Sequence, residues 1–230
     1  MDYYDLHIEV NDVDKVIELA KRLGYSGISI INIDKETAKS LSEKHEFDVI
    51  SSKMIVVNSK DELKKELSES RTNYEILIVS GGTYEINRAA CEDSRVDILA
   101  HPEKGRKDSG LDHICMKAAE ENDVAIEINF SEILNSGHRS RTMAFIRNNI
   151  MLAEKYNTKI IITSGAKSIW NLRAPRDLAS IGFLLGMELG KSIQSVSTIP
   201  EDIIRINREK LEGKRFGSVR IIGEKDGRQA

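Results

Sequence analysis

The stretch "DILAHPEKG", residues 97–105, places a short apolar run directly before a histidine and a proline. An unbroken apolar run is typical of a strand buried on both faces of a parallel sheet. In a parallel βα barrel, the functional side chains collect where such strands end. The stretch therefore predicts a barrel strand and makes His101 a candidate for a site at the barrel mouth.

The same strand pattern recurs along the chain and alternates with amphipathic helical patterns. Repeated strand and helix units favour a parallel sheet, and we expect a TIM-like α/β barrel in a single domain, with an open doubly wound sheet as the alternative. The expected strands are Tyr4–Val10, Gly27–Ile33, Asp48–Val57, Glu75–Ser80, Val96–Ala100, Val124–Asn129 and Lys159–Thr163.

Helix ends can also be located from the sequence. Asn11 is the expected N-cap of the first helix, and Gly24 follows its last turn. After Thr163 the pattern becomes mainly helical, and residues 177–190 and 200–213 each predict one helix. In the first of these we expect Phe183 and Leu184 to be buried.

Composition limits the class of protein. The chain has 230 residues, of which 40% are hydrophobic and 31% charged, as expected for a soluble globular protein with a sizeable core. We expect the barrel to span residues 1–212, and residues 213–230 to form a short, partly flexible extension. No apolar run approaches the length of a membrane helix, and the first ten residues lack the features of a signal peptide. A cytoplasmic protein with no membrane partner is predicted.

Several polar residues end predicted strands and should share one rim of the barrel, namely His7, His101, Asn129 and Ser164. A catalytic metal needs several converging ligands, which a single histidine does not supply. Gly81 and Gly82 also follow a strand and precede a helix. Their N–H groups either meet a phosphate or form only a tight turn.

Some of these residues lie in motifs of a known family. "DLHIE" at 5–9 resembles the D-L-H-x-H opening of the polymerase and histidinol phosphatase (PHP) family, whose members are metal-dependent phosphoesterases with a distorted βα barrel. "AHPEKG" at 100–105 resembles its H-P-x-R strand end. Against that pattern, Glu9 stands in place of the second histidine, Gly165 in place of an acid and Lys167 in place of another histidine. Losing an acid and gaining a lysine weakens cation binding, so we expect no bound metal and only structural roles for His7 and His101.

A closer resemblance covers nearly the whole chain. The sequence is similar to the ribonuclease P protein component 3 family, which has a PHP-like fold. The segments that carry this resemblance are "YYDLHI" at 3–8, "DILAHP" at 97–102, "IEINFSEIL" at 126–134, "SRTMAFIRNNIMLAEKY" at 140–156 and "IITSGAKSIWNLRAPRDL" at 161–178.

The resemblance implies a subunit of ribonuclease P, a ribonucleoprotein endonuclease that removes the 5′ leader of precursor tRNA. In that family of enzymes the RNA subunit carries out the hydrolysis with magnesium. The protein would bind and organise this RNA, would use no cofactor and no catalytic residue of its own, and would meet precursor tRNA indirectly. Its expected protein partners are ribonuclease P protein component 2, in a possible heterotetramer, and the other protein subunits.

The distribution of charge is compatible with RNA binding. Residues 138–177 carry 8 basic and 2 acidic side chains, although the whole chain has a net charge of -3. Arginine and lysine neutralise phosphates, and Trp170 could stack on a base. The expected RNA-binding residues are Arg88, Lys104, Arg106, Lys107, Arg139, Arg141, Arg147, Lys167, Arg173 and Arg176. The alternative is a solvated basic surface with no partner.

Two other functions remain open from the sequence. The first is a surviving PHP-type phosphoesterase, with one metal held by Asp5, His7, Glu9 and His101. The second is a βα-barrel enzyme that binds a phosphorylated small molecule through Gly81, Gly82 and Lys167.

Overall fold

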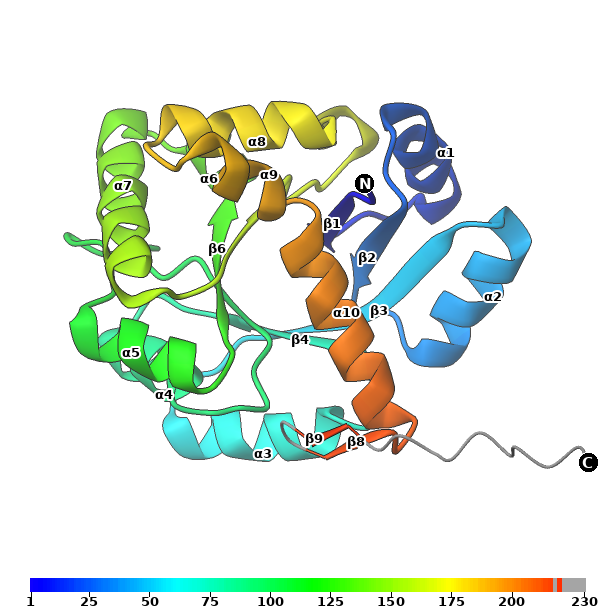
Figure 1. Ribbon diagram of the computed structural model, residues 1–230, viewed down its shortest axis with the longest axis horizontal. Coiled ribbons are helices and arrows are strands. Elements are labelled where there is room, and N and C mark those ends of the chain that lie inside the picture. Colours follow the sequence, from blue (N-terminus) through cyan, green and yellow to red (C-terminus); the bar gives the residue numbers. More distant parts are fainter. Residues whose placement is uncertain (217–218, 221–230) are drawn as a thin grey trace, which may run out of the picture.

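Seven parallel strands form the core of the molecule (Figure 1). The computed structural model describes residues 1–216 and 219–220. The strands are hydrogen-bonded in sequence order, from β1 to β7. Their bounds are β1 Tyr4–Ile8, β2 Gly27–Ile31, β3 Asp48–Ile55, β4 Ile76–Ser80, β5 Ile98–Ala100, β6 Ala125–Asn129 and β7 Ile160–Thr163.

The sheet curls into a nearly closed barrel. Beyond the end of β7, Ala166 forms a parallel bridge with Ile8 of β1, and its carbonyl oxygen accepts a hydrogen bond of 2.8 Å from the Glu9 amide. The strand order does not reverse anywhere in the sheet, as it would in an open doubly wound fold. All seven strands predicted from the sequence are confirmed, and so is the TIM-like barrel.

Helices connect the strands and surround the barrel (Figure 1). Their bounds are α1 Val13–Leu23, α2 Lys35–His45, α3 Lys60–Ser70, α4 Tyr84–Cys91, α5 His113–Glu121, α6 Phe130–Asn135, α7 Arg139–Tyr156, η1 Ile169–Asn171, α8 Pro175–Leu184, α9 Leu189–Gln194 and α10 Thr198–Leu211. None of the helices within the described residues is both long enough and apolar enough to span a membrane.

Two local predictions were wrong. The N-cap of α1 is Asp12 and not Asn11, because the Asp12 carboxylate accepts a hydrogen bond from the amide of Lys15. Residues 177–190 form two helices instead of one. The break lies at Gly186, whose φ of +110° cannot continue a right-handed helix.

The core has an inner and an outer part. Inside the barrel, side chains such as Leu6, Ile50, Ile98 and Ile161 pack against one another. Outside it, the other faces of the strands pack against the helices in two larger apolar clusters. Strands buried on both faces explain why the apolar runs in the sequence lack alternation.

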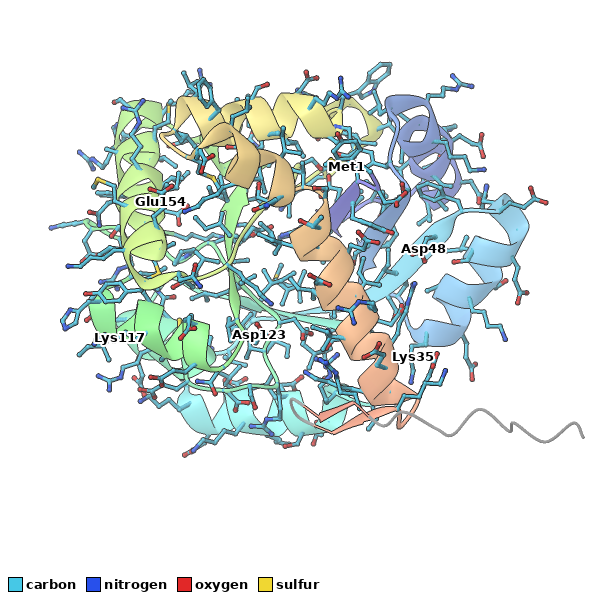
Figure 2. The ribbon with its side chains drawn as sticks, in the orientation of Figure 1. Met1, Lys35, Asp48, Lys117, Asp123 and Glu154 are labelled. Carbon is cyan, nitrogen blue, oxygen red and sulfur yellow. The ribbon has the colours of Figure 1, made fainter. Side chains whose placement is uncertain are left out.

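Helix α10 closes the amino-terminal end of the barrel. Its Ile203 and Ile204 belong to the inner apolar cluster, and the helix runs across this face of the molecule (Figure 1). Asp48, at the start of β3, lies on the same side (Figure 2).

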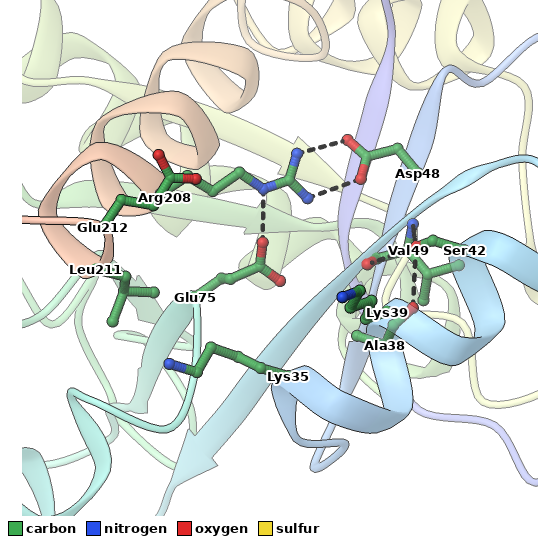
Figure 3. Close-up of a pocket in the computed structure, with 10 residues that line it drawn as sticks. All are labelled: Lys35, Ala38, Lys39, Ser42, Asp48, Val49, Glu75, Arg208, Leu211 and Glu212. Atoms are coloured by element: carbon green, nitrogen blue, oxygen red, sulfur yellow. Dashed lines mark hydrogen bonds and ion pairs between the residues drawn. The ribbon is translucent and has the colours of Figure 1, made fainter. Parts of the chain in front are cut away.

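Polar contacts fix α10 to the strand starts. Arg208 binds Asp48 at 2.7 Å and Glu75, just before β4, at 2.6 Å, beside a groove of about 530 Å³ (Figure 3). Asn207 donates to Asp97, just before β5, at 2.8 Å. The acids at the starts of three successive strands therefore each have a hydrogen-bond partner on α10.

After α10, Arg215–Phe216 and Val219–Arg220 pair as short antiparallel strands β8 and β9. A short strand was expected in this part of the chain. Residues 217–218 and 221–230 of the expected extension lie outside the described residues, so its flexibility stays a prediction.

Replacing Arg208 with alanine should lower the free energy of unfolding by about 2–3 kcal/mol, because two carboxylates would lose their charged partner. Arg205 is a matched control, since its partners Asp202 and Glu209 lie on the same helix. Arg205→Ala should cost less than about 1 kcal/mol. Urea unfolding of both variants measures the difference, and equal losses would contradict the closing role of Arg208.

Candidate site at the barrel mouth

A β-bulge in β1 turns His7 into the barrel mouth. The pairing register with β2 shifts between Asp5 and Ile8. Leu6 packs inside the barrel, whereas Ile8 packs outside it, although strict alternation would put both on the same face. Bulges of this kind re-aim side chains near functional sites.

His7 meets Glu127 of β6 in a buried ion pair. His7 Nδ1 lies 2.7 Å from Glu127 Oε1, and the Glu127 side chain is 0% exposed. The hydroxyl of Thr163 in β7 donates to the same oxygen at 2.5 Å, and the Asn129 amide does so at 3.3 Å. Glu127 thus joins the strands on either side of the barrel seam.

Electrostatics in this cluster favour a charged pair. Burial alone would raise the pKa of Glu127, but the charge and hydrogen bond of His7 hold that pKa at about 2. Burial would lower the pKa of His7, yet Glu127 raises it above its ordinary value. For His101, burial prevails and lowers the pKa. These shifts favour an ion pair between His7 and Glu127 and disfavour a charge on His101.

His101 stands next to this pair in an unusual backbone conformation. Its φ is +53°, in the left-handed region that non-glycine residues rarely adopt. Its ring centroid lies 5.5 Å from that of His7, and its Nδ1 lies 3.7 Å from Glu132 Oε1. The ligand atoms of His7, His101 and Glu127 all lie within 4.8 Å of one another, so these three residues could hold a metal ion.

The ligand set considered from the sequence does not assemble. Asp5 accepts hydrogen bonds from the Ser164 amide at 3.1 and 3.2 Å and from the His7 amide at 3.3 Å. Glu9 is exposed and lies 3.5 Å from Lys167 Nζ. Neither carboxylate belongs to the group formed by His7 and His101, whereas Glu127, which was not singled out, does.

Asn129 fills the space beside Gly165, the position at which the PHP pattern has an acid. Gly165 has a φ of +59°, and a Cβ there would lie 2.1 Å from Asn129 Oδ1. A side chain at position 165 and the present Asn129 are therefore mutually exclusive. Asn129 had been placed on this rim from the sequence, but its contact with Glu127 had not been foreseen.

A cavity of about 180 Å³ opens above the cluster. His7, His101 and Asn129 line it together with charged side chains of both signs, namely Glu9, Glu132, Lys104 and Lys167. Of the ten predicted RNA-binding residues, two line this cavity. The mouth is therefore mixed in charge and is not lined mainly by basic side chains.

The family of the chain follows from comparison with known proteins. The family model described as RNase P subunit p30 matches residues 2–212. The chain belongs to the RNase P subunit p30 family. Ribonuclease P protein component 3 of Methanosarcina barkeri is 36% identical over 94% of this chain and 92% of its own length.

Solved structures agree with this family. A chain in the cryo-EM structure of archaeal ribonuclease P with mature tRNA superposes with a TM-score of 0.81 and 31% identity, covering 96% of this chain and 100% of that one. A histidinol phosphate phosphatase from Lactococcus lactis has a TM-score of 0.55 and 12% identity, over 83% of this chain and 94% of its own. The second likeness concerns the fold alone.

The other eight predicted RNA-binding residues of this p30-family chain lie outside the mouth cavity. Five of them already contact protein groups, as Arg88 does with Glu92 and Arg106 with Asp108. The remaining three of these five, Arg139, Arg147 and Arg173, donate to backbone carbonyls. Within the described part of the chain, four of the ten predicted residues form no side-chain hydrogen bond or ion pair, namely Lys104, Lys107, Arg141 and Arg176.

The glycine pair is a tight turn. The Gly81 amide donates to the Ala100 carbonyl at 2.7 Å, and the Gly82 amide donates to Asn87 Oδ1 at 3.0 Å. Because both N–H groups already have acceptors, they are not available to a phosphate. This removes the observation that favoured a small-molecule phosphate enzyme.

Two apolar features lie on the surface. Phe183 and Leu184 are each 58% exposed, so the expectation that they are buried was wrong. They fall at the end of α8, where the chain leaves the barrel wall towards Gly186. Trp170 is 81% exposed, which leaves its ring accessible to a base.

Gly165→Ala should lower the free energy of unfolding by about 2–4 kcal/mol, because it combines a left-handed φ with a clash against Asn129. Gly137→Ala is the matched control, since a Cβ there meets nothing within 4 Å. It should stay within about 0.5 kcal/mol of wild type.

The double variant Asn129→Ala/Gly165→Ala should cost less than the sum of the two single variants, because the clash is then absent. Chemical denaturation of the four proteins measures this coupling. Strict additivity would contradict the steric exclusion described above.

Proposed function

We propose that this chain acts as a non-catalytic protein subunit of ribonuclease P and promotes removal of the 5′ leader of precursor tRNA by the catalytic RNA. The observation that carries the proposal is similarity over 96% of the chain, in sequence and in structure, to a chain of an archaeal ribonuclease P complex. The proposed site of action is the cytoplasm.

The barrel mouth supports a binding role more than a hydrolytic one. A PHP-type phosphoesterase would need carboxylates converging on its metals, but Asp5 is engaged by backbone amides and position 165 has no side chain. We therefore propose that the magnesium of the reaction is held by the RNA and that this chain contributes no catalytic residue.

The proposed partners are the catalytic RNA, ribonuclease P protein component 2 and the other protein subunits, with precursor tRNA contacted indirectly. The ten basic residues predicted from the sequence remain the proposed RNA contacts. Lys104, Lys107, Arg141 and Arg176 are the strongest candidates among them, because they are exposed and form no side-chain hydrogen bond or ion pair with the residues that the structure describes. Exposed Phe183 and Leu184 could contribute apolar area to a contact with another protein subunit.

Reconstitution tests the function. The catalytic RNA and component 2 are assayed for cleavage of precursor tRNA at limiting magnesium, with and without this chain. Addition of the chain should raise the cleavage rate, because basic side chains neutralise RNA phosphates and lower the magnesium requirement. No gain at any magnesium concentration would contradict the proposal.

The proposed RNA contacts have their own test. The variant Lys104→Gln/Lys107→Gln/Arg141→Gln/Arg176→Gln should bind the RNA more weakly. The slope of log affinity against log salt should become shallower by about 0.7–0.9 for each RNA phosphate that the variant no longer neutralises.

The control removes the same charge from the other end and outer wall of the barrel. It is Lys39→Gln/Lys64→Gln/Lys65→Gln/Lys210→Gln, whose lysines are all exposed. Equal salt slopes for the two variants would show that the RNA-binding residues are wrongly assigned.

A further inference from the structure

We propose that His7, His101 and Glu127 bind a single transition-metal dication of the zinc class at the barrel mouth. Their ligand atoms lie within 4.8 Å of one another. Two imidazoles and one carboxylate form a donor set that zinc accepts with one position left open. The inference departs from the expectation that the chain binds no metal. The reason is Glu127, a ligand that no motif in the sequence indicates.

Unsatisfied polar atoms support this site. Two buried atoms of the cluster, Nδ1 of His101 and Oε2 of Glu127, have no hydrogen-bond partner among the described residues. The His101 side chain is 10% exposed and the Glu127 side chain is fully buried. Native structures seldom leave buried polar atoms without a partner. A cation held by the cluster is the partner that we infer for these side chains.

The backbone of His101 is a second, independent observation. A histidine with a φ of +53° is held against its own preference, and such strain concentrates at sites where a side chain must be aimed. The strand end and the turn closed by the Lys104 amide, which donates to the His101 carbonyl at 3.0 Å, hold the residue in this conformation. The imidazole is thereby placed beside His7.

The surrounding charges allow a cation to enter. The cavity above the cluster is lined by Glu9 and Glu132 as well as by Lys104 and Lys167, so the lysines do not outnumber the nearby acids. Two acids thus balance two lysines in the lining, and Glu127 lies beside the histidines of the cluster.

The same geometry limits the number and kind of ions. Asn129 occupies the space beside Gly165, so position 165 supplies no acid for a second ion. Nitrogen donors suit zinc, cobalt and nickel, whereas magnesium prefers oxygen ligands and keeps its waters. The proposed ion is therefore distinct from the magnesium of the proposed RNA-catalysed reaction, and the inference does not depend on that reaction.

A bound ion would tie together β1, β5 and β6 at their carboxyl ends. It would fix His101, from which the loop carrying Lys104 and Lys107 begins. Its role would be positional, because it would hold these three strand ends together.

The test uses the full-length chain, stripped with a chelator and titrated with zinc and with cobalt. We expect one ion per chain, a rise in melting temperature with zinc, and a visible absorption spectrum of low-coordinate cobalt. His101→Asn should weaken binding at least tenfold and abolish the thermal shift. Asparagine tolerates a positive φ, so this variant should keep the fold, which near-ultraviolet circular dichroism verifies.

His138→Asn is the matched control, because His138 is exposed and does not belong to the group of three ligands. It should bind metal as the wild type does. Glu127→Gln provides a second probe, and its loss of cobalt absorption should parallel that of His101→Asn. Absence of a stoichiometric ion in the wild type, or equal binding by His101→Asn, would overturn the proposal.

Discussion

The buried ion pair between His7 and Glu127 is the constraint on which the barrel mouth depends. A carboxylate with no exposed surface must be neutralised and hydrogen-bonded, or its burial would cost several kcal/mol. The β1 bulge directs His7 towards this carboxylate, and the Thr163 hydroxyl and the Asn129 amide donate hydrogen bonds to it. Because Asn129 is needed there, position 165 must be glycine. The pair also bridges β1 and β6, on both sides of the seam at which β7 closes the barrel.

The two ends of the barrel are built for different purposes. At the amino-terminal end, α10 gives each of three acids a partner and fills the barrel with Ile203 and Ile204, so that end is closed. At the carboxyl end, a small cavity stays open above the histidines, with both lysines and glutamates in its lining. This p30-family chain thus has one end of its barrel closed by a helix and the other end open as a polar cavity.

The sequence predicted the barrel well because its strands are apolar on both faces, a signal that survives without any knowledge of their neighbours. It failed where one contact decides between near equivalents, as with Asp12 in place of Asn11, or where a single glycine ends a helix, as at Gly186. Glu127 was missed because it lies within an apolar run, "AIEIN", where a lone acid gives no spacing motif. Its partner His7 is 120 residues away, and only the closed barrel brings the two together. The exposure of Phe183 was also not predicted, because it depends on where α8 ends relative to the neighbouring helices.

A double-mutant cycle on His7 and Glu127 tests the central claim most directly. Unfolding free energies would be measured for wild type, His7→Ala, Glu127→Gln and the double variant, with a chelator present throughout. The account predicts that the two residues are coupled by about 2–3 kcal/mol, because each single substitution leaves a buried polar group without its partner. A coupling energy near zero would mean that the pair does not organise the mouth, and would contradict the account.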